Sequence, residues 1–228
     1  MKQSTVVLIL LLCAGCASTR APVPFALEPG DLLFQDLDAG PLCDAIETVT
    51  HGVDGAKFSH VGMVARVENG QPFVIEAVGA GVVETPLEDF LSRSNDEAGR
   101  PKVLVGRIVG EPARLVPRAI DVSRSYLGRP YDSIFVMDNS SFYCSELIYE
   151  SFREANNGTP IFELAPMTFK DPATSATFPA WTSYYAELGI AIPEGKPGLN
   201  PGGMSRAAFV RIVHAYGQPA GWPGSPAP

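Results

Sequence analysis

The feature that most restricts the fold is a pair of apolar segments on either side of an Asn-Gly dipeptide. Ser59 to Val67 and Phe73 to Val78 are rich in apolar and β-branched residues, a composition typical of β-strands. Asn69-Gly70 lies between them, and these two residue types readily adopt the positive φ angles that tight hairpin turns require. The pattern predicts a β-hairpin and therefore an antiparallel sheet.

Strand and helix patterns alternate along the rest of the chain. Further short strands are predicted at residues 31–35 and 103–109. Helices are predicted at residues 42–51, at 86–92 after a Thr85-Pro86-Leu87-Glu88 capping box, at 117–127 and at 141–155. Residues 160–205 are rich in proline and aromatic residues without a clear period, and residues 206–215 fit either a strand or a helix. Together these segments predict an α+β fold, a small antiparallel sheet or half-barrel with packed helices.

The N-terminal residues carry signals of export and lipid attachment. Lys2 precedes an apolar run, Val6 to Leu12, that is too short to span a bilayer. Cys13-Ala14-Gly15-Cys16 then matches a lipobox, except that Cys13 stands where leucine is usual. We therefore expect residues 1–15 to be a lipoprotein signal peptide and Cys16 to be the lipidated N-terminus. A plain signal peptide that is cleaved elsewhere is the alternative.

The lipid anchor would set the organisation and the location of the chain. Residues 16–28 would form the lipidated N-terminus and a spacer, followed by one domain at 29–216 and a disordered Gly- and Pro-rich tail at 217–228. Several acyl chains attach a protein stably to a membrane. We expect a protein of the cell envelope that faces the periplasm, at the outer membrane in a Gram-negative cell, since Ala17 rather than aspartate follows the cysteine.

The charge of the chain argues against two classes of partner. The formal net charge is −8, and no block of lysine or arginine residues is present. Binding of nucleic acid or of anionic lipid headgroups relies on such blocks. We therefore expect a small-molecule, peptide or peptidoglycan substrate, no nucleic acid, and membrane contact through the lipid anchor.

Cys144 lies in the first turn of the helix predicted at residues 141–155. The positive end of the helix dipole and the N–H groups of the first turn favour a thiolate at such a position. The same N–H groups can stabilise an oxyanion beside the sulfur. The alternative is that Cys144 is a small buried hydrophobe, which is the common fate of a free cysteine.

A catalytic thiolate needs a base, and the histidines of the chain are His51, His60 and His214. His60 begins a predicted strand beside Gly62, which leaves room for a close approach; a purely structural histidine is the alternative. Glu76 is a carboxylate inside the second apolar segment, and a buried carboxylate needs a partner. It could orient the imidazole of His60 as the third member of a triad.

The register of the hairpin tests this pairing. A regular two-residue turn at Asn69-Gly70 places Glu76 opposite Met63, on the wrong face of the sheet for His60. One β-bulge, or a loop of three or five residues, shifts the register and brings both side chains to one face. If Glu76 belongs to the site, the hairpin must contain such an irregularity.

Six motifs occur in a fixed order along the chain. They are Gly30-Asp31-Leu32-Leu33-Phe34-Gln35, Phe58-Ser59-His60-Val61-Gly62-Met63, Ile75-Glu76-Ala77, Thr85-Pro86-Leu87, Tyr126-Leu127-Gly128-Arg129-Pro130-Tyr131-Asp132 and Tyr143-Cys144-Ser145-Glu146-Leu147. In this order they resemble the permuted papain-like amidases, the YiiX/YaeF-like branch of the NlpC-type cysteine peptidase superfamily. The resemblance covers roughly residues 29–155 and implies a circularly permuted papain-like fold, in which the nucleophile helix follows the sheet.

The resemblance also implies roles for individual residues. It makes Cys144 the nucleophile, His60 the general base and Glu76 its orienting carboxylate, and it places Tyr143 near the oxyanion or substrate pocket. Ser145, Asp31 and Tyr131 stand in the same motifs and are further candidates for that pocket.

The expected function is that of a cysteine hydrolase that cleaves an amide of the peptide, peptidoglycan or acyl-amino-acid type through an acyl-enzyme, without a cofactor. A lipid-directed thioesterase or acyltransferase is the first alternative, and a long apolar groove beside Cys144 would favour it. A non-catalytic binding module of the envelope is the second. It would be favoured by a Cys144 that is buried, disulfide-bonded or far from His60.

Two other uses of Cys144 are possible on paper. A disulfide with Cys43 suits an oxidising compartment, but it would consume the nucleophile. A zinc site of Cys144, His60 and Glu76 lacks the close ligand pair, such as Cys-x-x-Cys, that zinc sites usually contain. We therefore expect no metal.

Overall fold

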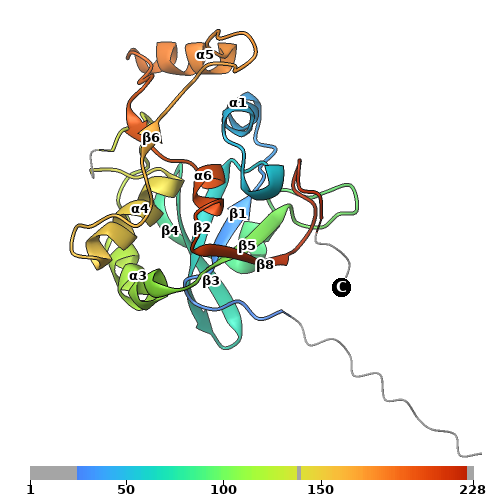
Figure 1. Cartoon of the computed structure of the whole chain (residues 1–228), viewed down its shortest axis with the longest axis vertical. Helices are drawn as coiled ribbons and strands as arrows, with labels where there is room; N and C mark the ends of the chain where they lie inside the picture. The colour runs from blue at the N-terminus through green and yellow to red at the C-terminus, as the bar shows by residue number, and fades with distance from the viewer. Residues whose placement is uncertain (1–24, 138–139, 225–228) are drawn as a thin grey trace, which may run out of the picture.

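An antiparallel sheet forms the centre of the domain (Figure 1). The computed structural model describes residues 25–137 and 140–224, and within them six strands pair in the order β4-β3-β2-β1-β5-β8. The strands are β1 (Leu32–Gln35), β2 (His60–Glu68), β3 (Gln71–Val78), β4 (Gly81–Pro86), β5 (Val103–Ile108) and β8 (Val210–Ala215). Every neighbouring pair is antiparallel. The predicted α+β fold with an antiparallel sheet is confirmed.

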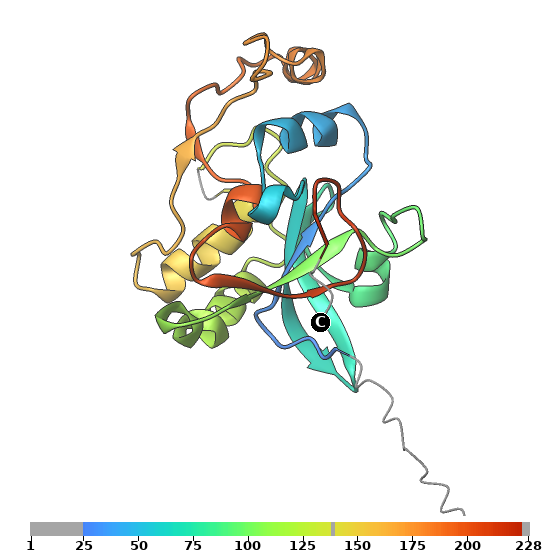
Figure 2. The same ribbon diagram turned by 45° about the vertical axis from the view of Figure 1, so that its right-hand side comes forward.

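Helices cover the sheet and extend beyond one end of it. They are α1 (Pro41–Val49), α2 (Leu87–Leu91), α3 (Val116–Ser125), α4 (Cys144–Ala155), α5 (Pro179–Leu188) and α6 (Pro201–Ser205), with short 3₁₀ turns η1 (Val53–Gly55) and η2 (Glu111–Leu115). α4 packs against β2 and β3, with α3 beside it. Figures 1 and 2 both show α5 standing away from the sheet, beyond α1.

The main core lies between α4 and one face of the sheet. Leu147, Ile148 and Phe152 of α4 are buried with Met63 and Ile75 of the hairpin. Burial of each such side chain contributes about 1.5–3 kcal/mol, so this contact fixes the position of the helix and of the cysteine with which it begins. The predicted apolar face of this helix is confirmed.

The hairpin contains the irregularity on which the Glu76 hypothesis depended. Near the turn Arg66 pairs with Phe73, as a two-residue turn requires, but beyond it Val64 pairs with Val74 and Met63 with Ile75. Ala65 is therefore the extra residue of a β-bulge. Because a one-residue shift exchanges the two faces of a strand, Glu76 and His60 project from the same face.

Strand β4 was not predicted from the sequence, because the pattern at Thr85 indicated the cap of a helix. Thr85 and Pro86 end β4, and α2 begins only at Leu87 without a side-chain cap. The threonine hydroxyl donates instead to Glu76, at 2.5 Å. The predicted capping box is wrong because a tertiary partner replaces the local one.

The C-terminal residues 217–224 do not form the expected disordered tail. Trp222 is buried in the main core cluster. The N–H groups of Gln218 and Ala220 donate to Asp96 at 3.0 Å and to Asp36 at 2.7 Å. These contacts compensate for the Gly- and Pro-rich composition and fix this part of the segment; residues 225–228 lie outside the described residues.

Two further points concern the membrane. Among residues 25–137 and 140–224, no helix is both long and apolar enough to cross a bilayer. The predicted signal peptide and the lipidation site Cys16 lie outside the described residues, so the anchor stays a prediction.

Candidate active site

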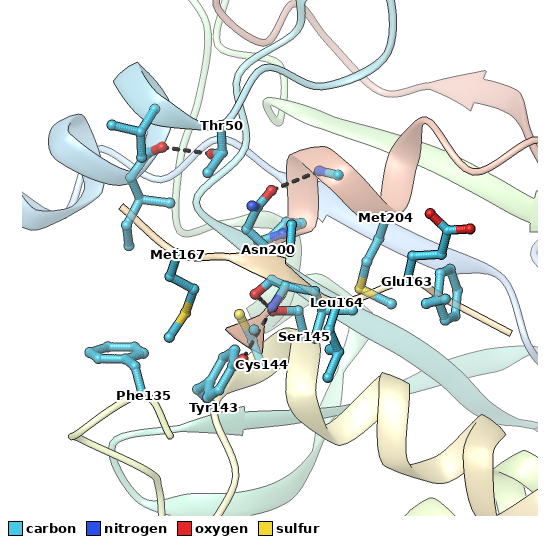
Figure 3. Close-up of a pocket in the computed structure, with 18 of the residues that line it drawn as sticks. Thr50, Phe135, Tyr143, Cys144, Ser145, Glu163, Leu164, Met167, Asn200 and Met204 are labelled. Carbon is cyan, nitrogen blue, oxygen red and sulfur yellow. Dashed lines mark hydrogen bonds between the residues drawn. The ribbon is translucent and has the colours of Figure 1, made fainter. Parts of the chain in front are cut away.

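Cys144 is the first residue of α4, and it lines a cavity of about 660 Å³ (Figure 3). The residue is 8 % exposed, so it is largely buried, yet its sulfur borders the cavity. Tyr143 precedes it in extended conformation, and the carboxylate of Glu146 accepts a hydrogen bond from the Tyr143 N–H at 3.3 Å. The first N–H groups of a helix have no intrahelical carbonyl partner, so this end of α4 presents donors beside the thiol.

His60 is the first residue of β2 and is almost fully buried, at 6 % exposed. Its Nε2 lies 2.6 Å from Oε2 of Glu76, which leaves Nδ1 for Cys144. Burial alone lowers the pKa of His60. The hydrogen bonds and charges of Cys144 and Glu76 outweigh burial and raise this pKa to about 9. The imidazolium is therefore favoured at neutral pH.

Glu76 is fully buried and has a saturated set of donors. Besides His60, its two oxygens accept from Thr85 Oγ1 at 2.5 Å and from both terminal nitrogens of Arg93, at 2.7 and 2.6 Å. Burial alone raises the pKa of Glu76, but the hydrogen bonds from His60, Arg93 and Thr85 lower it to about 2. Glu76 is thus a carboxylate that orients the imidazole of His60.

The structure therefore brings together the three residues that the sequence motifs implied as a triad, Cys144, His60 and Glu76. Arg93 and Thr85 were missed. Arg93 lies in the turn after α2, 17 residues from Glu76, and no local pattern links the two. A buried carboxylate that lacks a second partner was the signal that could have prompted a search for an arginine.

The other predicted pocket residues divide into two groups. Tyr143 and Tyr131 line the cavity, and Tyr143 Oη accepts a hydrogen bond from the Leu199 N–H at 3.4 Å. Ser145 also lines it, but its hydroxyl donates to the Leu199 carbonyl at 3.0 Å. This bond ties α4 to the far wall of the cavity. Because the Ser145 hydroxyl donates its proton to the Leu199 carbonyl, it does not donate that proton to a substrate.

Asp31 is the predicted pocket residue that the structure places elsewhere. It is not among the residues that line the cavity. Its carboxylate accepts from Arg107 Nε at 2.7 Å and Nη2 at 2.8 Å, and from the Glu28 N–H at 2.8 Å. Asp31 therefore fixes the start of β1 on β5, and the structure does not bring it to the cavity beside Cys144.

The cavity wall is mostly apolar and comes largely from the segment that carried no sequence pattern. Between α4 and β8 the chain forms β6 (Ala165–Pro166), α5, β7 (Pro197–Gly198) and α6, and β6 pairs with β7. Side chains of this segment that line the cavity include those of Ile161, Phe162, Leu164, Met167, Phe169, Trp181, Leu199 and Met204. Figure 3 shows Met167 and Leu164 among the residues that surround the same cavity as Cys144. The charged lining residues include Glu163 and Arg206, both exposed.

Phe135 closes the same cavity next to Tyr143 (Figure 3). Its φ of 55° is rare for a bulky residue. The carboxylate of Asp132 holds this loop by accepting from the N–H groups of Ile134 at 2.8 Å and Val136 at 2.7 Å. The Phe135 ring lies edge-on to Trp181, with centroids 5.6 Å apart. The loop thus holds an aromatic wall in a strained conformation.

Neither alternative use of Cys144 is supported by the described residues. Cys43 and Cys144 are both free thiols, and burial is the main cause that raises the pKa of Cys43. Within residues 25–137 and 140–224, no group of three or more His, Cys, Asp or Glu side chains is placed to hold a metal ion. The third ligand of a zinc site with Cys144 and His60 would be Glu76, but both oxygens of the Glu76 carboxylate accept hydrogen bonds from Arg93.

An antiparallel sheet that supplies a histidine and a glutamate, followed by a buried helix that begins at a cysteine, defines a permuted papain-like domain. The chain belongs to the permuted papain-like amidase family YaeF/YiiX, peptidase family C92, whose model matches residues 26–214. This confirms the family and the fold that the six motifs implied, and the family indicates amidase- or peptidase-like activity.

Two relatives from Escherichia coli agree with this assignment. The uncharacterized protein YiiX of strain K12 is 31 % identical over 134 residues, which are 58 % of this chain and 61 % of that protein. The crystal structure of the metalloprotein YiiX from strain O157:H7 superposes with a TM-score of 0.68 at 26 % identity, over 85 % of this chain and 99 % of that one. The word metalloprotein describes that protein; within the part of this chain that the structure describes, Cys144, His60 and Glu76 are not grouped to hold a metal ion.

Proposed function

We propose that this chain is a cysteine hydrolase that cleaves an amide bond through an acyl-enzyme on Cys144. The observation that carries the proposal is the arrangement of three side chains. The thiol at the start of α4 borders a cavity and interacts with His60, whose other ring nitrogen is held by the buried carboxylate Glu76. This is the relation of nucleophile, base and orienting group that thiol catalysis requires.

The first half of the reaction follows from this geometry. The Cys144 thiolate attacks the carbonyl carbon of the substrate, and the N–H groups at the start of α4 stabilise the oxyanion. The His60 imidazolium gives its Nδ1 proton to the leaving nitrogen, the carbon–nitrogen bond breaks, and an amine departs. The acyl group remains on Cys144 as a thioester.

In the second half, water replaces the amine. Neutral His60 takes a proton from the water through Nδ1 while the water oxygen attacks the thioester carbonyl. The carbon–sulfur bond breaks, the carboxylic acid leaves, and the thiolate–imidazolium pair is restored. Throughout, Glu76 remains ionised and keeps the imidazole oriented.

The apolar cavity wall favours an apolar acyl group as the part of the substrate beside Cys144. Among the peptide, peptidoglycan and acyl-amino-acid amides expected from the sequence, an apolar wall supports an acyl-amino-acid more than a peptide of the cell wall. The same observation supports the second candidate, a lipid-directed thioesterase or acyltransferase, because a thiolate attacks an amide, an ester and a thioester in the same way. The two candidates differ in the leaving group.

The test uses the full chain in detergent with four classes of substrate: N-acyl-glycines of different chain length, an octanoyl ester, an octanoyl thioester and muropeptides. We expect hydrolysis of octanoyl-glycine to exceed that of acetyl-glycine by about tenfold or more, since each buried methylene contributes about 0.8 kcal/mol. Cys144→Ser and His60→Ala should abolish it, and Cys43→Ser is the matched thiol control. Ester or thioester cleavage without amide cleavage would favour the second candidate. Activity confined to muropeptides would refute the acyl assignment, and activity of Cys144→Ser would refute the mechanism.

We also propose that Cys16 carries lipid and holds the domain at the cell envelope, facing the periplasm. The support is the lipobox-like sequence Cys13-Ala14-Gly15-Cys16. Phe25 stacks on His214 of the edge strand β8, with ring centroids 4.3 Å apart, so the chain joins the domain at a sheet edge. Palmitate labelling should be lost in Cys16→Ser, and persistent labelling of that variant would contradict the anchor.

A further inference from the structure

We infer that Arg93 is a positioning residue of the site, which holds Glu76 in place and balances its charge so that the Cys144–His60 ion pair can form. The inference deepens the proposed function and rests on it. Arg93 contacts Glu76 but is not among the residues that line the cavity. It would therefore act through Glu76 and not on the substrate.

The contact between Arg93 and Glu76 is the geometrically most specific one in the site. Nη1 donates to Oε2 at 2.7 Å and Nη2 to Oε1 at 2.6 Å, a bidentate arrangement that fixes the plane of a carboxylate. Oε2 is also the atom that faces His60, at 2.6 Å. A rotation of the carboxylate away from His60 would break both bonds to Arg93.

Helix α2 and the turn that follows it bring two side chains to the site together, Phe90 from the helix and Arg93 from the turn. The guanidinium of Arg93 lies 5.3 Å from the centre of the Phe90 ring, and that ring lies 5.8 Å from the ring of His60. Phe90 is fully buried, whereas the side chain of Arg93 is 29 % exposed. Phe90 thus shields His60 from water, and Arg93 closes the site behind the carboxylate.

Charge balance gives the arginine a role beyond packing. In the reactive form the thiolate and the Glu76 carboxylate are anions, and the imidazolium and the guanidinium are cations, so the buried group is neutral overall. Hydrogen bonds to Glu76 raise the pKa of Arg93 further, and Asp89 of α2 is the other charged group that interacts with it. Without Arg93, the thiolate would form beside an uncompensated carboxylate.

After the loss of Arg93, Glu76 can either stay ionised or take up a proton, and both outcomes disfavour the Cys144 thiolate. If Glu76 stays ionised, its charge repels the thiolate. If Glu76 takes up a proton, His60 loses the anion that stabilises its imidazolium. A charge within about 4–6 Å of a titrating group changes the pKa of that group by about 1–3 units, and Glu76 lies 2.6 Å from His60. The low-pH limb of Cys144 alkylation should therefore move to higher pH, and the alkylation rate at pH 6 should fall by about tenfold or more.

The chain offers a matched control in Arg66. Its side chain is also 29 % exposed, and its Nε donates to a carboxylate of the same sheet, Glu84, at 2.9 Å. Among the described residues, Arg66 contacts Glu84, Glu68 and the ring of Phe73, so Arg66→Ala removes a comparable arginine–carboxylate pair without touching the proposed triad.

The experiment measures carbamidomethylation of Cys144 by iodoacetamide from pH 4 to 10, resolved by mass spectrometry of the full chain, in wild type, Arg93→Ala, Arg93→Lys, Arg66→Ala and His60→Ala. We expect a shifted low-pH limb in Arg93→Ala, partial recovery in Arg93→Lys, which keeps the charge but loses the bidentate geometry, and a wild-type profile in Arg66→Ala. If Arg93→Ala does not fold, the Lys variant alone should show the shift.

The outcomes separate this inference from the proposed function. A folded Arg93→Ala with the wild-type profile, or an equal shift in Arg66→Ala, would overturn the role of Arg93 while the effect of His60→Ala stands. If Arg93→Ala does not fold, a wild-type profile in the Lys variant would overturn it as well. Equal labelling of wild type and His60→Ala at pH 6 would instead overturn the ion pair, and with it the proposed function.

Discussion

Replacement of Glu76 by glutamine is the most informative single change in this protein. The side chain keeps its shape and can still hydrogen bond, but it loses the charge that His60 and Arg93 contact. Glu76→Gln therefore tests whether that charge stabilises the fold and sustains the ion pair. The two effects have different pH dependences.

The size of the effect follows from the two pKa values. The pKa of His60 rises from 6.5 to about 9 and that of Glu76 falls from 4.5 to about 2, and each change corresponds to about 3 kcal/mol. The two figures share the His60–Glu76 attraction and are not added; Cys144 also raises the pKa of His60, and Arg93 and Thr85 also lower that of Glu76. Removal of one partner of a buried ion pair costs a similar amount, about 3–5 kcal/mol.

The sign of each pH dependence is fixed by the direction of the pKa change. The raised pKa of His60 stabilises the folded state fully below pH 6.5 and ceases to do so as the pH rises through about 9. The lowered pKa of Glu76 stabilises it above pH 4.5 and ceases to do so as the pH falls through about 2. The loss of stability in Glu76→Gln should therefore be largest between pH 4.5 and 6.5 and smaller above pH 9.

Urea unfolding at pH 5.5, 7 and 9.5 measures this difference, and iodoacetamide labelling of Cys144 measures the ion pair in the same samples. We expect Glu76→Gln to lose about 3 kcal/mol of unfolding free energy at pH 5.5 and to label about tenfold more slowly at pH 6. The reasoning is refuted if labelling is unchanged in a destabilised variant, because Glu76 would then be structural only. A loss of stability that does not vary with pH would refute the electrostatic account.

Other substitutions test separate parts of the structure. Gly62→Ala should cost about 1–3 kcal/mol in thermal or urea unfolding, because the added methyl would lie 2.4 Å from Val74 Cγ1; a neutral effect would show that the hairpin tolerates a shift beside the site. Met167→Ala should widen the cavity and move the preferred acyl-glycine toward longer chains, and an unchanged preference would remove Met167 from the acyl-binding wall. Cys43→Ser should leave hydrolysis and labelling of Cys144 unchanged, since both thiols are free; a loss of activity would give Cys43 a role in the reaction.

The sequence was sufficient to predict those elements whose signals are local. The hairpin at Asn69-Gly70 and the helix predicted at residues 141–155 follow from turn chemistry and from helical spacing, and both are present, although the helix begins only at Cys144. The bulge at Ala65 could be stated only as a condition, because the turn fixes the register near itself and not farther along the strands. The position of the bulge is set by which side chains of the two strands must be buried on each face of the sheet.

Features that depend on distant partners were missed or misassigned. Thr85 has the local signature of a helix cap, but the buried Glu76 uses its hydroxyl. Asp31 stands in a family motif, yet its partner is Arg107, 76 residues away. The segment 160–205 has no period because its order comes from aromatic contacts with other elements, such as that of Trp181 with Phe135.

The reacting groups and most of the cavity wall lie on different stretches of the chain. His60, Glu76 and Cys144 belong to the sheet and to the helix packed on it, whereas the apolar wall is built mainly by the excursion between α4 and β8. Substitutions in that excursion can change which molecule fits without moving the groups that break its bond. Relatives that share the three residues therefore need not share a substrate, and transfer of an activity between them requires comparison of this one segment.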